Sequence, residues 1–249
     1  MVVDVHTHLF ARDYEAAKKK LMDAMDRYGI DISYVSAIEG SPYPTMDIID
    51  EGNAAVAQFC KEQPDRIRGY VYISPEQPNA MDVLKRGIED QGMSGVKLWI
   101  STTCDAPEVE PLAEKMIEYG VPVLLHSFYK VQGAYMYETH GGHVANLAKK
   151  FPKLKILMAH LGGNAYHGIP CIRDLPNVWV DYSLSSYWGD MLPYTYEILG
   201  AERILHGSDL PGIYTSNIGN ILEVDMTDEE RELILWKNSE KLFDKNFKL

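Results

Sequence analysis

The chain of 249 residues contains few cysteines, and the three it has, Cys60, Cys104 and Cys171, lie far apart. A disulfide framework or a zinc site made of thiolates needs more cysteines at closer spacing. We therefore expect free thiols in a reducing compartment, and any metal site must use other ligands.

Positive charge is scarce as well. The chain has 24 lysines and arginines against 36 aspartates and glutamates, which gives a net charge of −12. Nucleic acids and anionic membrane surfaces bind proteins through clustered positive charge. The acidic balance therefore predicts a protein with neither a nucleic-acid partner nor a membrane partner.

Long apolar runs are also missing. No stretch approaches the roughly 20 residues of a membrane-spanning helix. Met1 is followed at once by the strand-like run Val2 to Val5, without the basic region and apolar stretch of a signal peptide. We therefore expect a cytoplasmic protein that acts on a small molecule, with a homodimer as the default assembly.

Short apolar runs alternate along the chain with longer amphipathic stretches, the pattern of repeated βα units. The candidate strands are Val2 to His6, Tyr34 to Ile38, Arg68 to Ile73, Gly95 to Leu98, Val121 to His126, Lys155 to His160, Val178 to Asp181 and Arg203 to Gly207. The candidate helices are Arg12 to Tyr28, Ile48 to Lys61, Ala80 to Gln91, Glu110 to Tyr119, Val144 to Phe151, Ala165 to Leu175, Pro193 to Leu199 and Asp228 to Phe243.

Eight strands, each followed by a helix and without a Pro/Gly/Ser-rich linker, predict a single α/β domain over residues 1–249, a TIM (β/α)8 barrel. An open α/β sheet of seven or eight strands is the alternative. Thr227 and Glu230 form a capping-box pattern that predicts the start of the last helix.

Histidines and an aspartate mark the ends of several predicted strands. His6 and His8 are two positions apart on the first strand, so both side chains point to one face and can share a cation. His126 ends the fifth strand, His160 ends the sixth, and Asp209 follows the eighth. The carboxyl ends of barrel strands meet at the rim where TIM-barrel active sites form, so we expect these groups to converge.

Five motifs carry a resemblance to a known family. They are Asp4-Val5-His6-Thr7-His8, Leu125-His126, Ala159-His160-Leu161-Gly162-Gly163, His206-Gly207-Ser208-Asp209-Leu210-Pro211 and Asn238-Ser239-Glu240-Lys241-Leu242-Phe243. Together they resemble the amidohydrolase superfamily, and within it the amidohydrolase-related family, over essentially the whole chain. That family includes lactonases, amide hydrolases and nonoxidative decarboxylases that act on carboxylated, often aromatic, substrates.

The resemblance implies that His6, His8, His126 and Asp209 hold one divalent metal with an open position for water. Imidazole and carboxylate ligands suit zinc first, with manganese or iron as alternatives. The resemblance also implies that His160 polarises the substrate or shuttles a proton. Asp209 would take the proton of the metal water, so both residues are candidate catalytic groups.

Lys97 on the fourth strand decides between one metal and two. In two-metal relatives a carboxylated lysine at this strand holds a second cation with the histidines of strands 5 and 6, here His126 and His160. We favour one metal, with Lys97 facing the substrate or paired with an acid.

Other residues near the strand ends carry weaker expectations. Asp4 shares the face of His6 and His8 by alternation and would either orient the site or serve the structure. His206 lies an odd number of positions before Asp209 and should pack toward the helices. Aromatic and loop residues expected near the rim are Trp99, Tyr129, Tyr135, Tyr182, Tyr187, Trp188 and the segment Gly40 to Pro44.

The expected function is that of a metal-dependent hydrolase, which uses a metal-activated water on a small amide, ester or lactone, often carboxylated. The alternative is a nonoxidative decarboxylase, which would place Arg12, Lys130, Arg173 or Lys97 against the substrate carboxylate. A TatD-type deoxyribonuclease is disfavoured because Lys97 stands where a glutamate is usual and because the chain is acidic. An inactive metal-binding barrel is disfavoured because structural sites are usually closed.

Overall fold

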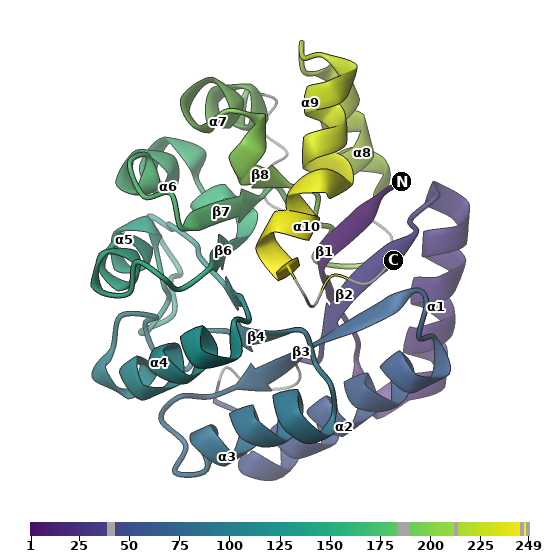
Figure 1. Ribbon diagram of the computed structural model, residues 1–249, viewed down its shortest axis with the longest axis vertical. Coiled ribbons are helices and arrows are strands. Elements are labelled where there is room, and N and C mark those ends of the chain that lie inside the picture. The colour runs from purple at the N-terminus through teal and green to yellow at the C-terminus, as the bar shows by residue number, and fades with distance from the viewer. Residues whose placement is uncertain (39–42, 184–189, 212–213, 245–246, 248–249) are drawn as a thin grey trace.

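The computed structural model describes residues 1–38, 43–183, 190–211, 214–244 and 247, without the side chains of 214–216 and 223. Eight parallel strands form one sheet in the order β1 to β8, and helices surround it (Figure 1). The strands are β1 Val3–His8, β2 Ile32–Ser36, β3 Ile67–Ile73, β4 Gly95–Leu98, β5 Val123–Leu125, β6 Ile156–Met158, β7 Val178–Asp181 and β8 Ile204–Leu205.

The sheet closes on itself, because the segment around β8 pairs with β1. The amide of Val5 donates to the carbonyl of His206 at 2.9 Å, and the amide of Ser208 donates to the carbonyl of His6 at 3.0 Å. A parallel bridge between Thr7 and Asp209 continues this pairing. The predicted TIM barrel is confirmed.

The helices follow the predicted pattern, with one addition. The α-helices are α1 Tyr14–Tyr28, α2 Met46–Glu62, α3 Ala80–Lys85, α4 Glu110–Tyr119, α5 Gly141–Lys150, α6 Ala165–Ile172, α7 Met191–Leu199, α8 Tyr214–Glu223, α9 Asp228–Glu232 and α10 Asn238–Phe243. Helix α8 was not predicted. The capping box of Thr227 and Glu230 is present at the start of α9. In the described part of the chain, no helix has the length and apolar character needed to cross a membrane.

The predicted helix from Ala80 to Gln91 changes its winding partway. Helix α3 ends at Lys85 and continues as a π-helical turn over Arg86–Asp90. A Cβ atom on Gly87 would lie 2.6 Å from the side chain of Val71 on β3. Glycine therefore allows the helix to approach the barrel closely at this turn.

The barrel has an inner core that closes the end at which the strands begin. Val3, Tyr34 and Tyr70 pack there with Leu242 and Phe243 of α10. The ring of Phe243 stacks on Tyr34 with centroids 3.7 Å apart. Helix α10 lies across this opening in Figure 1. Access to the barrel centre is therefore from the carboxyl ends of the strands.

The side chains of strand β1 do not alternate strictly between the two faces of the sheet. Its register against β2 shifts between Asp4 and Thr7. Val3 and Val5 belong to the inner core, so Asp4 between them faces away from the barrel axis. Its carboxylate accepts hydrogen bonds from the amides of His6 and Ser208, both at 3.0 Å. The prediction that Asp4 shares the face of His6 and His8 is wrong because of this register shift, and Asp4 instead ties β1 to the end of β8.

His206 packs outside the strands, as its odd spacing from Asp209 predicts. It is fully buried, and its Nδ1 lies 2.8 Å from the hydroxyl of Tyr182, a member of the core layer between strands and helices. Burial lowers the pKa of His206 to about 4 from an ordinary value of 6.5. The neutral imidazole is therefore the form that the folded chain accommodates.

This burial predicts a dependence of stability on pH. Between pH 6.5 and 4, His206 takes up a proton in the unfolded chain but not in the folded one, so the unfolding free energy falls as the pH falls. One such group contributes a slope of about 1.4 kcal/mol per pH unit. We expect His206→Gln to reduce the slope measured by urea unfolding by about this amount. Equal slopes for the two proteins would contradict the assignment.

Candidate functional site

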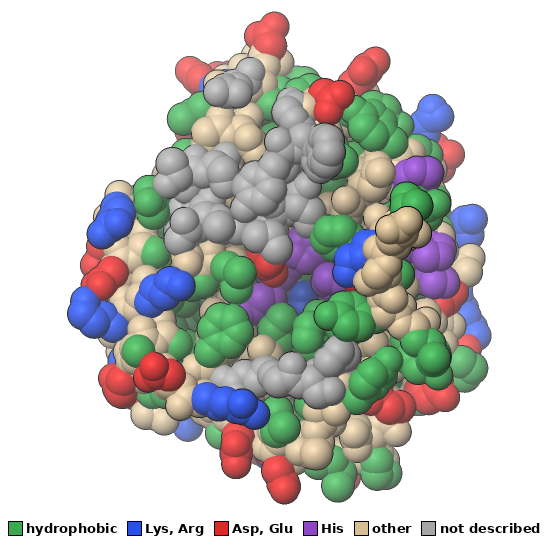
Figure 2. All heavy atoms as spheres, turned by 180° about the vertical axis from the view of Figure 1, so that it is seen from behind, with side chains coloured by type: hydrophobic (Ala, Val, Ile, Leu, Met, Phe, Trp, Pro, Cys, Tyr) green, Lys and Arg blue, Asp and Glu red, His purple; other side chains and the backbone are tan. Residues whose placement is uncertain are grey.

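A cavity of about 430 Å³ opens among the carboxyl ends of the strands. Figure 2 shows this face, with histidine side chains at the base of a hollow that hydrophobic side chains border. Its polar lining comes from His8, His126, Lys130, His160 and Asp209, and its apolar lining from Phe10, Ile38, Trp99, Phe128 and Leu210.

Three of the four predicted metal ligands meet at one point. The Nε2 atoms of His6 and His8 are 3.2 Å apart. The Oδ1 atom of Asp209 lies 3.4 Å from the first and 3.1 Å from the second. All three residues are buried. These atoms belong to one of two groups of side chains, among the described residues, that could hold a metal ion.

Hydrogen bonds on the far side of each ring show which nitrogen carries the proton. His6 Nδ1 lies 3.0 Å from a carboxylate oxygen of Asp181. His8 Nδ1 lies 2.9 Å from the hydroxyl and 3.3 Å from the carbonyl oxygen of Ser36. Carboxylate and carbonyl oxygens only accept, so Nδ1 is the donor in both rings and Nε2 keeps a lone pair.

The donor set therefore fits a divalent cation. Neither Nε2 atom nor the Asp209 carboxylate brings a proton to their mutual contact. Bonds from a metal to nitrogen and oxygen are about 2.0–2.2 Å long, so two ligands of one tetrahedral ion lie roughly 3.3–3.6 Å apart. The observed separations of 3.1–3.4 Å are close to this spacing. A catalytic site with three protein ligands keeps a position open.

Burial and charge hold these groups in the protonation states that a metal requires. Burial lowers the pKa of His8 to about 4, against the opposing effect of Asp209. Burial raises the pKa of Asp209, but its close contact with His8 and the proximity of His160 and His6 outweigh this and leave the pKa far below its usual value. At neutral pH the site therefore presents a neutral imidazole and an ionised carboxylate.

The backbone of the site adopts an uncommon conformation. Asp209 has φ 66°. His160 and Leu161, which follow each other in the chain, have φ 61° and 50°. Residues other than glycine rarely enter this left-handed region, and each instance costs about 1–3 kcal/mol. Such strain persists where surrounding contacts fix it, and here it accompanies two of the predicted functional residues.

His126, the fourth predicted ligand, lines the cavity with a different partner. Its Nε2 lies 3.0 Å from Oε1 of the buried Glu138. The same oxygen accepts from Lys130 at 2.8 Å, and the other accepts from the amide of Tyr135 at 3.2 Å. Burial raises the pKa of Glu138, but the bonds from His126 and Lys130 outweigh it and keep the carboxyl ionised. Glu138 was not anticipated, and whether His126 reaches the metal stays a prediction.

Lys97 lies at the base of the site. It is fully buried on β4, and its Nζ is 3.2 Å from Nε2 of His6. Burial lowers its pKa to about 8, while the charges of Asp209 and Asp181 act in the opposite direction. The structure thus places Lys97 beside the candidate metal ligands. Its carboxylation and a second metal stay predictions.

The other cationic side chains considered as partners of a substrate carboxylate differ in whether they lie at the cavity. Lys130 lines the cavity. Arg12 lies on another hollow, beside Tyr14 and Glu51 on α1 and α2. Arg173 is exposed at the end of α6. Lys130 and Lys97 are therefore the two that the structure brings to the site.

The predicted aromatic lining is only partly correct. Trp99 lines the cavity, as do Phe10 and Phe128, which were not predicted. Tyr182 does not reach the cavity lining and is buried beside His206, in the core layer between strands and helices. Tyr187, Trp188 and residues 40–42 of the predicted loop lie outside the described residues.

Asp181 and Ser183 form a buried network that was not predicted. Asp181 Oδ1 accepts from the amides of Ser183 at 3.0 Å and His160 at 3.1 Å, while its Oδ2 faces His6. The hydroxyl of Ser183 lies 2.7 Å from His160 Nδ1. Asp181 belongs to the second group of possible metal ligands, with His6 and His160, but His6 Nδ1 already bonds to Asp181 and His160 Nδ1 to Ser183. A polar residue at the end of β7 was the sequence signal that could have found Asp181.

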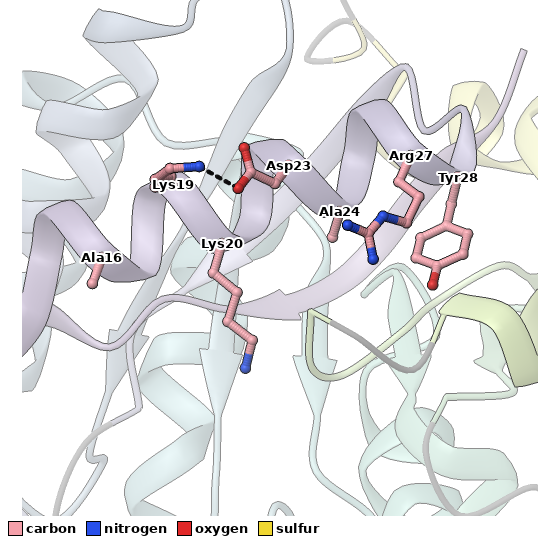
Figure 3. A pocket seen from close by; sticks show the side chains of 7 residues that line it. All are labelled: Ala16, Lys19, Lys20, Asp23, Ala24, Arg27 and Tyr28. Carbon is pink, nitrogen blue, oxygen red and sulfur yellow. Dashed lines mark hydrogen bonds and ion pairs between the residues drawn. The ribbon is translucent and has the colours of Figure 1, made fainter.

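A second hollow lies on the outside of the barrel along α1. Figure 3 shows its side chains, which include Lys19, Lys20, Asp23 and Arg27. Lys19 and Asp23 form an ion pair at 2.5 Å, with both side chains more than half exposed. Exposed pairs of this kind are solvated and contribute little. The cavity at the strand ends is therefore the candidate functional site.

The sequence of the chain is similar to that of a known protein. The chain is 26% identical over 211 residues to the gamma-resorcylate decarboxylase of Rhodococcus jostii (strain RHA1), a match that covers 68% of this chain and 62% of that protein. The matched part is thus less than two thirds of the length of this curated relative.

Solved structures share the fold. The 2,6-dihydroxybenzoate decarboxylase from Rhizobium superposes with a TM-score of 0.77 at 18% identity, over 99% of each chain. The dihydroxybenzoic acid decarboxylase from Polaromonas sp. JS666, with bound manganese and the inhibitor 2-nitroresorcinol, gives 0.76 at 17% identity, over 99% of this chain and 98% of that one. At such identities the likeness is one of fold. The amidohydrolase family model matches residues 3–245, and the protein therefore belongs to the amidohydrolase family.

Proposed function

We propose that the protein is a metal-dependent nonoxidative decarboxylase of aromatic carboxylic acids. The observation that carries the proposal is one cavity that joins three converging metal donors, flat aromatic walls and a lysine. The hydrolase expected from the sequence is not confirmed. The decarboxylase alternative is better supported by the cavity and by the relatives.

The walls of the cavity favour a planar substrate. Phe10, Trp99 and Phe128 contribute rings, and Ile38 and Leu210 add aliphatic surface. Aromatic side chains stack on or pack edge-to-face against other rings, so walls of this kind suit a benzoate better than a flexible amide. His126 lies parallel to Phe128, with ring centroids 6.0 Å apart, which extends the flat surface toward the metal donors.

Lys130 supplies the charge that a carboxylate needs. Its ammonium group lies 2.8 Å from Glu138, and it lies over the rings of Phe128 and Tyr135 at 4.9 and 5.0 Å. These contacts fix a half-buried cation at the cavity wall. Of the described residues that line the cavity, it alone is a lysine or an arginine. An amide or a lactone would not require this charge.

The relatives support the same choice. The Rhodococcus jostii relative is named a decarboxylase, and so are the Rhizobium and Polaromonas proteins of the same fold. The Polaromonas structure contains manganese, whereas the imidazole-rich donors of this chain also suit zinc. The proposal therefore specifies a divalent transition metal.

Decarboxylation requires one proton at the carbon that loses its carboxyl group. The carbon–carboxyl bond breaks, carbon dioxide leaves, and the electron pair that remains on the ring carbon takes a proton. A divalent cation bound at this site would stabilise negative charge on the substrate oxygens. Asp209 is one of the metal donors, and His160 lines the cavity beside them, so we assign proton movement to these two residues. Lys130 would orient the carboxylate.

The proposal is tested by offering the zinc- or manganese-loaded protein a panel of hydroxylated benzoates, aromatic amides and lactones. We expect carbon dioxide and the decarboxylated arene from the benzoates, and a large loss of both with Asp209→Asn. Hydrolysis of an amide or lactone without release of carbon dioxide from any benzoate would contradict the proposal and support the hydrolase.

Replacing Lys130 tests the carboxylate subsite. Charged hydrogen bonds contribute about 1.5–3 kcal/mol, so Lys130→Met should raise KM for a benzoate by about 10- to 100-fold. Lys130→Arg should preserve most of the affinity, because it keeps the charge. Lys20→Met, on the exposed surface of α1, is the matched control and should change nothing. An unchanged KM in Lys130→Met would exclude Lys130 from substrate binding.

A further inference from the structure

A buried chain of hydrogen bonds joins a candidate metal ligand to the candidate proton carrier. It runs from His6 on β1 through Asp181 at the end of β7 and Ser183 beyond it to His160 after β6. His6, Asp181 and Ser183 are fully buried, and His160 is 3% exposed. Because these groups are buried and bond to one another, contacts within the protein determine where each proton lies.

The proton of the Ser183 hydroxyl can be assigned from geometry. Ser183 Oγ lies 2.5 Å from Asp181 Oδ1, and two oxygens at that distance need a proton between them. Asp181 Oδ1 does not supply it, because this oxygen already accepts from the backbone amides of Ser183 and His160, at 3.0 and 3.1 Å. A carboxyl oxygen that accepts two N–H bonds is not the one that carries a proton. Ser183 is therefore the donor to Asp181.

The tautomer of His160 follows from this assignment. Ser183 has one hydroxyl proton, and Asp181 receives it. The contact of 2.7 Å between Ser183 Oγ and His160 Nδ1 must then be one in which Nδ1–H donates to the serine oxygen. The amide of His160 also donates to Asp181, at 3.1 Å, which holds the left-handed turn at this residue. The ring is thus fixed with its proton on Nδ1.

We propose that Ser183, held by Asp181, is a positioning residue that keeps the proton of His160 on Nδ1 and leaves the lone pair of Nε2 free for the cavity. The same Asp181 carboxylate accepts from Nδ1 of His6 and leaves its Nε2 to the metal donors. One buried acid therefore orients two histidines with different tasks. In its resting state His160 accepts a proton at Nε2 before it can deliver one.

The inference rests on the proposed function only where it assigns a task to His160. Histidine ring nitrogen resonances show which nitrogen carries the proton, and they need no substrate. We would record them on the ¹⁵N-histidine-labelled, zinc-loaded protein, with His160→Gln to assign the signals. We expect His160 to show a protonated Nδ1 and an unprotonated Nε2. A proton on Nε2 in the unaltered protein would overturn the proposal, whatever the activity.

Substitution of Ser183 separates positioning from structure. In Ser183→Ala we expect the His160 signals to move toward the other tautomer, and kcat to fall by about 10- to 100-fold with little change in KM. Ser183→Thr keeps the hydroxyl and should restore both readouts. Ser36→Ala removes a hydroxyl beside His8 instead and should leave the His160 signals unchanged. Unaltered His160 signals in Ser183→Ala would contradict the proposal, and normal signals in a protein without decarboxylase activity would contradict only the proposed function.

Discussion

Mutual repulsion among three lone pairs is the constraint around which the centre of this barrel is arranged. His6 and His8 turn their unprotonated nitrogens toward each other and toward the Asp209 carboxylate, at 3.1–3.4 Å. Such an arrangement is costly without positive charge in a buried site. Lys97 supplies part of that charge from β4, and a divalent cation would supply more. The closure of β8 on β1, the register shift at Asp4 and the left-handed backbone at Asp209 all serve to hold these atoms together.

The surroundings of this centre divide into two sides with different chemistry. On one side, Asp181 and Ser183 fix the histidines by hydrogen bonds on their Nδ1 atoms. On the other, Glu138 holds His126 and Lys130 at the wall of the cavity. The first side determines which nitrogen atoms face the candidate metal site and the cavity. The second presents a cation and flat apolar surface, which is why we propose a carboxylated aromatic compound, rather than an amide, as the substrate.

Much of this arrangement was predictable from the sequence. The alternation of apolar runs located all eight strands, and the histidines at strand ends located the rim, because both signals are local. Helix α8 was missed since Tyr214–Glu223 is rich in Thr, Ser, Asn and Gly, which are weak helix formers. Glu138 was missed because it lies in a long loop where only tertiary contacts set its position. Asp4 was misplaced because a register shift leaves no trace in residue spacing.

The central claim, that His6, His8 and Asp209 hold a divalent metal, is tested most directly by metal analysis of the purified protein and its variants. We predict stoichiometric zinc or manganese in the unaltered protein and in His160→Ala, and its loss from both His6→Ala and Asp209→Ala. A protein that keeps its metal in Asp209→Ala but loses it in His160→Ala would place the ion beside Asp181 instead, and would contradict the account.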